Sequence, residues 1–253
     1  MKKQTLLNLI FPILSFAMIL LFWTICAKVY NKPLILPSVG QTLSQFFALF
    51  GQKQFYLDTL LTFLRSLLAF AISLVLAVIF ATLSTLCNPV KLILSPIVNI
   101  LASTPVMAVL LLLLVFIKSA FLPIVVAFLM VFPVTYTNVQ TAFENANKKF
   151  APLCKVYGIS LWIKLFGVWF PTAGETIYQQ CKTSLSMCVK VVISGEVLAH
   201  TSNSLGSAMQ SASLSVEVDK LLAFCFVALA LSYLAQLLVV AVYKLSKGVK
   251  KCR

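Results

Sequence analysis

The sequence has few charged residues, few acidic residues and a single histidine. Only 10% of its 253 residues are charged, whereas soluble domains carry about 25%. The lone His200 argues against a multi-histidine metal site and against a histidine-based catalytic triad. No Gly-Lys dipeptide occurs, which excludes a nucleotide-binding Walker A loop. We therefore expect no enzyme, no metal site and no cofactor in this chain.

Long runs without charge define the fold class. The composition is 61% hydrophobic, and about 20 apolar residues are enough to cross a bilayer. A large soluble helical protein would not carry such runs. We predict an all-α integral membrane protein with one domain, residues 1–253. Its six transmembrane helices are expected at about 6–27, 59–86, 92–116, 119–140, 172–198 and 221–243.

Basic residues orient the six predicted spans. The formal net charge is +14, a value that also occurs in nucleic-acid-binding proteins. With the N-terminus inside, twelve basic residues lie on the inner side and five on the outer side. This asymmetry follows the positive-inside rule, so we expect both termini in the cytoplasm, contact with anionic membrane lipid and no nucleic-acid partner. The inner group is Lys2, Lys3, Lys91, Lys148, Lys149, Lys155, Lys164, Lys244, Lys247, Lys250, Lys251 and Arg253.

The N-terminus and the cysteines have simple interpretations. Lys2 and Lys3 precede an apolar run that is longer than the 7–15 residues of a signal peptide, and no small-x-small cleavage site follows. We expect an uncleaved first span. The seven cysteines show no C-x-x-C spacing, so we interpret them as small hydrophobic residues.

One segment between the fourth and fifth spans combines basic and apolar residues. Within the predicted cytoplasmic loop 141–171, Leu153, Val156, Tyr157 and Leu161 recur at helical spacing and form one apolar stripe. Gly158 permits a turn, and Pro171 fits the first turn of the next helix. Such a stripe indicates a surface on which another molecule packs, either a protein or the membrane surface.

This segment resembles the cytoplasmic loop of permease subunits of bacterial ABC importers. In that signature Glu-Ala-Ala is followed by three residues, Gly, nine residues and Ile-x-Leu-Pro. Gly158 and Pro171 are in register with it, whereas Pro152-Leu153-Cys154 stands in place of Glu-Ala-Ala. The run Thr59 to Arg65 is similar to the opening of the second span in the taurine, sulfonate, nitrate and pyrimidine-precursor importers. Two further matches are Leu36-Pro37-Ser38 after the first span, and Glu196 followed by Leu205-Gly206.

The resemblance implies a fold, partners and a mechanism. The chain would be a type I permease in the inner membrane and would form a homodimer. Its partners would be two ABC ATPase subunits and an extracytoplasmic solute-binding protein. ATP and Mg would bind to the separate ATPase. Gly158 would be the turn between two coupling helices, with Pro171 at the end of the motif. The residues expected to contact the ATPase are Leu153, Val156, Tyr157, Leu161 and Trp162, with Lys155 and Lys164 at the rim.

Several charged residues lie within or near predicted spans, and we single out Arg65, Lys182, Lys190 and Glu196. Intramembrane charges usually face a cavity or a partner. We therefore take these residues as candidates for the pathway of a small polar or anionic solute. The alternative for the two lysines is structural pairing with Glu196 or with a carbonyl group. The main alternative function is an ATP-independent secondary transporter or channel, which the lack of an inverted repeat disfavours; a membrane enzyme and a structural scaffold are further alternatives.

Overall fold

All regular elements that the structure describes are helices. A computed structural model describes residues 2–30, 32 and 34–251. The helices are α1 (Lys2–Tyr30), α2 (Val39–Leu49), α3 (Lys53–Leu86), α4 (Asn88–Ser103), α5 (Val106–Phe116), α6 (Leu122–Val156), α7 (Leu161–Ile163), the π-helical segment η1 (Lys164–Trp169), α8 (Phe170–Ala199), α9 (Leu205–Leu214) and α10 (Val218–Lys251).

Helices α3, α6 and α8 form the centre of the molecule. The buried side of α3 is lined by small residues at intervals of three or four, including Ser66, Ala69, Ser73, Ala77 and Ala81. Small side chains let helix backbones approach closely, which stabilises packing where the hydrophobic effect between helices is weak. Larger side chains of α6 fill the remaining space, among them the fully buried Val126, Val139 and Phe143.

The apolar helices agree in part with the six predicted spans. Within the described residues, Lys53–Leu86, Leu122–Val156 and Val218–Leu245 are long and apolar enough to cross a membrane. They overlap the spans predicted at 59–86, 119–140 and 221–243. Helix α1 contains a shorter apolar segment, Ala17–Tyr30, and α8 is a 30-residue helix interrupted by charges. Six spans therefore stays a prediction, while a multi-pass helical membrane protein is established.

The single span predicted at 92–116 is wrong in its shape. The structure divides it into α4 and α5, which bend by 98° at a short break. Thr104 and Pro105 form this break in extended conformation. Proline has no N–H for the helical ladder and disfavours helical geometry in the residue before it. The pair is thus a broken span or a re-entrant segment.

The predicted loop 141–171 is mostly helical. Helix α6 continues to Val156, and α7, η1 and α8 follow one another without interruption from Leu161. Only residues 157–160 of this segment are non-helical, and its bounds as a cytoplasmic loop stay a prediction. The charged residues after position 140 lie on the part of α6 that continues beyond the predicted span. Charged side chains do not prevent helix formation outside the bilayer, so α6 can continue past the end of the apolar run.

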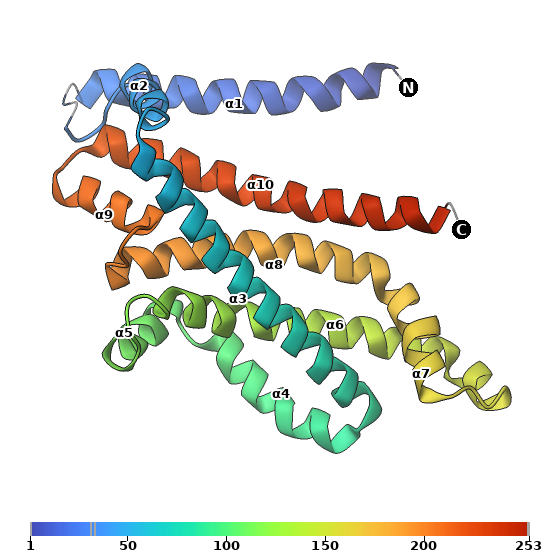
Figure 1. The fold of residues 1–253 in the computed structure, drawn as a ribbon. Coiled ribbons are helices and arrows are strands. Elements are labelled where there is room, and N and C mark those ends of the chain that lie inside the picture. The colour runs from blue at the N-terminus through green and yellow to red at the C-terminus, as the bar shows by residue number, and fades with distance from the viewer. Residues whose placement is uncertain (1, 31, 33, 252–253) are drawn as a thin grey trace.

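Figure 1 shows how the two ends of the molecule differ. The start of α1, the end of α10 and helix α7 lie at one end, whereas α2, α5 and α9 lie at the other. This common placement agrees with termini and loop on the same side of a membrane. Of the residues used to predict the topology, Arg253 lies outside the described residues. Cys252, one of the cysteines interpreted as small hydrophobic residues, also lies outside them. The side chains of Lys2, Lys3, Lys247, Lys250 and Lys251 are also not described.

Candidate functional site

The helical hairpin formed by the end of α6 and by α7 turns at Gly158. The φ angle of Gly158 is +57°, in the left-handed region that favours glycine. The Ile159 N–H donates to the Cys154 carbonyl at 3.0 Å, and the Gly158 N–H donates to the Lys155 carbonyl at 3.3 Å. These two bonds form a Schellman motif, which ends a helix abruptly. Gly158 therefore has the geometry predicted for the turn between two helices.

We call the exposed apolar side chains around this turn the tip patch: Leu153, Val156, Tyr157, Leu161 and Trp162. Val156 is 80% exposed, Tyr157 75% and Trp162 72%. The ring of Trp162 stacks on Phe166, and Phe166 stacks on Phe170, with interplanar angles of 4° and 7°. Trp162 of the tip patch is thus the first of three stacked aromatic rings, the last of which, Phe170, begins α8. Lys155 is exposed beside it, but the ammonium of Lys164 lies over the buried Trp169 ring, not at the rim.

A π-helical segment joins this hairpin to α8. It covers Lys164–Trp169 and ends just before Pro171, which lies in the first turn of α8. A proline inside a continuous helix removes one N–H and crowds the preceding turn. A widened turn at this position accommodates the ring without breaking the helix. Pro171 therefore lies in the first turn of α8, as the sequence predicted. The helical structure before it, however, is continuous from Leu161 through α7 and η1.

Glu196 lies at the opposite end of α8 and is fully buried. Its Oε1 accepts a hydrogen bond from Arg65 Nη1 at 2.8 Å, and its Oε2 accepts one from the Thr62 hydroxyl at 2.8 Å. The Gly206 N–H also donates to Oε2, at 3.2 Å. This arrangement, the Glu196 knot, ties α3 and α9 to α8. Glu196 is therefore paired within the subunit, and its role as a pathway residue stays a prediction.

Arg65 and Thr62 extend the Glu196 knot to the segment before α9. The guanidinium of Arg65 also donates to the Asn203 and Ser202 carbonyls, both at 3.3 Å. The Leu205 N–H donates to Thr62 Oγ1 at 3.0 Å, at the start of α9. Arg65 therefore acts as a clamp on this segment.

Gly206 lies against α8 more closely than any other side chain would allow. A Cβ atom at this position would come within 2.4 Å of Glu196 Cβ, 2.7 Å of Val197 N and 2.8 Å of Ile193 O. Ser204 caps α9 by accepting a hydrogen bond from the Ser207 N–H. The sequence pattern Leu205-Gly206 thus reflects close packing of α9 on α8.

Lys182 and Lys190 are placed away from Glu196. The alternative in which Glu196 pairs with one of them is wrong, because its partner is Arg65. The ammonium group of neither lysine has a hydrogen bond or ion pair within the part of the chain that the structure describes. A charge at the bilayer centre costs about 2.5–3.5 kcal/mol on insertion scales, so an ammonium group on a membrane-spanning helix usually faces water or a partner.

Sequence reasoning missed a buried polar network between α6 and α8. The Gln180 side-chain amide donates to the Ser184 hydroxyl at 2.8 Å and accepts from Asn138 at 2.5 Å. The hydroxyls of Thr135 and Ser184 lie 2.8 Å apart. The partners on the two helices are 42 to 49 residues apart in sequence, so no local sequence pattern predicts the network.

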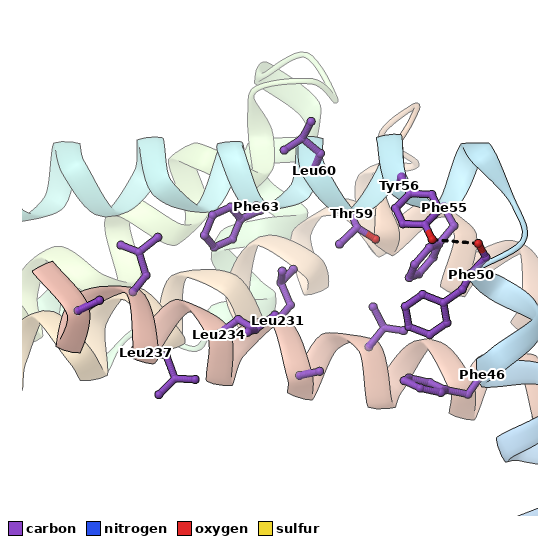
Figure 2. A pocket seen from close by; sticks show the side chains of 14 residues that line it. Phe46, Phe50, Phe55, Tyr56, Thr59, Leu60, Phe63, Leu231, Leu234 and Leu237 are labelled. Atoms are coloured by element: carbon purple, nitrogen blue, oxygen red, sulfur yellow. Dashed lines mark hydrogen bonds between the residues drawn. The ribbon is translucent and has the colours of Figure 1, made fainter.

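An apolar groove of about 740 Å³ lies between α2, α3 and α10 (Figure 2). Its aromatic residues include Phe46, Phe50, Phe55 and Tyr56, and the Tyr56 hydroxyl donates to the Phe50 carbonyl at 2.9 Å. The Thr59 hydroxyl in this groove has no hydrogen-bond partner among the described residues. No charged residue lines the groove, so it suits lipid chains or an apolar helix better than a polar solute.

The fold and the intramembrane charges define a class, a multi-pass helical membrane protein with polar groups inside its membrane segments. Residues 73–248 match the family described as "Binding-protein-dependent transport system inner membrane component". The match covers more than half of the chain, and the chain belongs to this family. It is therefore a membrane permease component of a binding-protein-dependent ABC transporter. Members are parts of transport systems and are generally not enzymes, and the family implies ATPase and solute-binding-protein partners. No curated protein sequence matches the chain.

Proposed function

We propose that this chain is the permease subunit of an ATP-driven importer, and that its tip patch docks on the ATPase. The observation that supports this most directly is the exposure of Val156, Tyr157 and Trp162 at the end of a helical hairpin. Large aromatic and aliphatic side chains that protrude into water form the energetic centre of many protein interfaces.

The placement of the tip patch supports a cytoplasmic partner. Helix α6 has 35 residues and is about 52 Å long, whereas the hydrocarbon core of a bilayer is about 30 Å thick. The hairpin thus projects beyond the membrane, at the same end as the start of α1 and the end of α10 (Figure 1). We place this end in the cytoplasm, with the chain in the inner membrane.

The remaining parts of the proposal follow from the same arrangement. Two copies of the chain form a homodimer within the lipid bilayer and enclose the solute pathway. ATP and Mg bind to the separate ATPase, whose closure moves the hairpin and alternates access to a small polar or anionic solute delivered by the binding protein. The Thr59-to-Arg65 motif, with Arg65 in the Glu196 knot, supports a place near the taurine, sulfonate, nitrate and pyrimidine-precursor importers.

Affinity purification from native membrane tests the docking of the ATPase. We expect a Walker A ATPase to accompany the parent chain and to be lost from Tyr157→Asp, because a charge would enter the centre of the tip patch. Leu214→Asp is a matched control, since Leu214 is also 75% exposed but ends α9 at the far end of the molecule.

The controls separate the docking proposal from its alternatives. Both variants should reach the membrane in equal amounts. Retention of the ATPase by Tyr157→Asp would contradict the tip patch as the docking surface. If Tyr157→Asp instead weakened binding to anionic lipid vesicles and left the ATPase bound, the hairpin would be a membrane-surface element.

A further inference from the structure

One side of α8 is polar along the length of the helix. Its exposed residues recur at intervals of three, four and seven, which places them on one face. Every exposed side chain in this series carries a hydroxyl, amide or ammonium group. The series is Thr172, Thr176, Gln179, Thr183, Lys190 and Ser194.

This polar face contrasts with the exposed surfaces of the neighbouring membrane helices. Leu229, Leu234 and Val242 are examples of exposed residues on α10, and they suit contact with lipid. Polar groups on a membrane-spanning helix instead face a water-filled space or a partner. The polar face of α8 therefore marks the side that faces away from lipid once the subunit is in its assembly.

Two lysines lie in the middle of α8: Lys190 belongs to this face, and Lys182, which is half-buried, lies about 80° from it around the helix. Lys182 and Lys190 are eight residues apart, a rise of about 12 Å along α8. Glu175, on the same side, lies near the start of α8, where it accepts hydrogen bonds from Gln179 and Tyr243. Three carboxylates form ion pairs within the described residues, with partners other than these lysines: Glu144 with Lys91, Glu196 with Arg65 and Glu217 with Lys220.

Hydrogen-bond donors converge between the two lysines. A pocket of about 350 Å³ is lined by Lys182, Thr183, Ser186, Lys190 and Gln236, together with Met187. The Ser186 oxygen accepts a hydrogen bond from the Gln236 amide at 3.0 Å, so its own O–H is available to donate. Two ammonium groups and a hydroxyl donor are the groups that bind an oxoanion.

We propose that the transported solute is a small oxoanion, held transiently between Lys182 and Lys190 as it passes along the polar face of α8. Carboxylate, sulfonate and phosphate groups share the required chemistry. The inference rests on the proposed function, since it assigns the solute class to the pathway of the same permease. The two lysines attract the anion electrostatically, and the hydroxyl and amide groups replace part of its hydration shell.

Charge-selective thiol labelling tests this site without knowledge of the solute. Thr183→Cys places an exposed thiol in the pocket, and Leu229→Cys places one on the lipid-facing side of α10. Each variant, in the assembled transporter in native membrane vesicles, is treated with a sulfonated and with a trimethylammonium methanethiosulfonate. Labelling at the new cysteine is followed by site-resolved mass spectrometry, because the parent chain carries seven cysteines.

We expect the new thiol of Thr183→Cys to react with both reagents and that of Leu229→Cys with neither. With each rate divided by that reagent's rate toward a small free thiol, the sulfonated reagent should react in the pocket on the order of tenfold faster than the cationic one, because the lysines raise the local anion concentration. Replacing both lysines by glutamine in the Thr183→Cys background should abolish this preference but leave the pocket thiol accessible.

Two results would overturn the inference. Failure of both reagents to label Thr183→Cys would place the polar face outside any aqueous pathway. Equal rates for the two reagents at that position, each taken relative to a small free thiol and with both lysines present, would remove the selection for anions. Neither result concerns the ATPase, whose absence from the purified complex would instead contradict the proposed function, so the two failures are distinguishable.

Discussion

Gly206→Ala should destabilise the contact between α9 and α8. The new Cβ would lie 2.4–2.8 Å from three atoms, and real Cβ atoms essentially never approach closer than 3.0 Å. Two of these atoms, Val197 N and Ile193 O, belong to the backbone of α8, which cannot rotate out of the way. Helix α9 must therefore move outward.

The expected free-energy cost follows from two effects. Forcing an extra methyl group into a filled contact costs about 1–3 kcal/mol. The outward movement also weakens the hydrogen bond from the Gly206 N–H to Glu196, and a bond to a charged group contributes about 1.5–3 kcal/mol. The two effects overlap, so we expect a total loss of roughly 2–4 kcal/mol in the free energy of unfolding.

Thermal unfolding of the purified chain in detergent measures this loss. By the scaling for globular proteins of this size, the midpoint should fall by roughly 5–15 °C. Gly174→Ala is the matched control, because nothing lies within 4 Å of its Cβ position and alanine favours helix. Equal midpoints for Gly206→Ala and Gly174→Ala would show that α9 does not pack on α8 as described.

Three further substitutions test the polar interior by the same unfolding measurement. Glu196→Gln should cost about 3–5 kcal/mol by leaving Arg65 without its carboxylate, and a double variant with Arg65→Met should recover part of the loss; additive losses would exclude the pair. Tyr136→Phe should cost about 1 kcal/mol through the lost bond to Ser84, whereas an unchanged midpoint would mean that this bond contributes nothing. Thr59→Val should stabilise the chain by about 1 kcal/mol, because the Thr59 hydroxyl is buried without a partner among the described residues, and a loss of stability would show that the hydroxyl is bonded.

The sequence predicted the helices whose signal is local. Uncharged runs of more than twenty residues identify α3, α6 and α10, since membrane insertion depends on the apolar content of one segment. The turn at Gly158 was also predictable, because a left-handed residue at a helix end favours glycine. In both cases the determining residues are neighbours in the chain.

Features that depend on distant residues could not be predicted in this way. Glu196 and Arg65 are separated by 131 positions, and nothing near either residue identifies the other as its partner. The sharp break at Pro105 was also missed, because a proline in a membrane helix can cause a slight kink or a complete turn, depending on what packs beside it.

The polar face of α8 is an intermediate case. Its periodicity is present in the sequence, but the prediction was based on the charged residues Lys182, Lys190 and Glu196 and not on the threonine and serine residues between them. Once Glu196 is seen to point inward, the exposed polar residues form a single series. A search for hydroxyl and amide groups at helical spacing would have found this face.

The length of α6 has a mechanical consequence. Its 35 residues form one helix from the membrane to the tip patch, so the helix can act as a lever. A rigid rod about 52 Å long that tilts by about 10° around one end moves its other end by about 9 Å. Small rotations of the packed helices would thus become large displacements at the hairpin, and the reverse also holds. A push on the hairpin would reach the centre of the bilayer as a slight rotation of the buried face of α6.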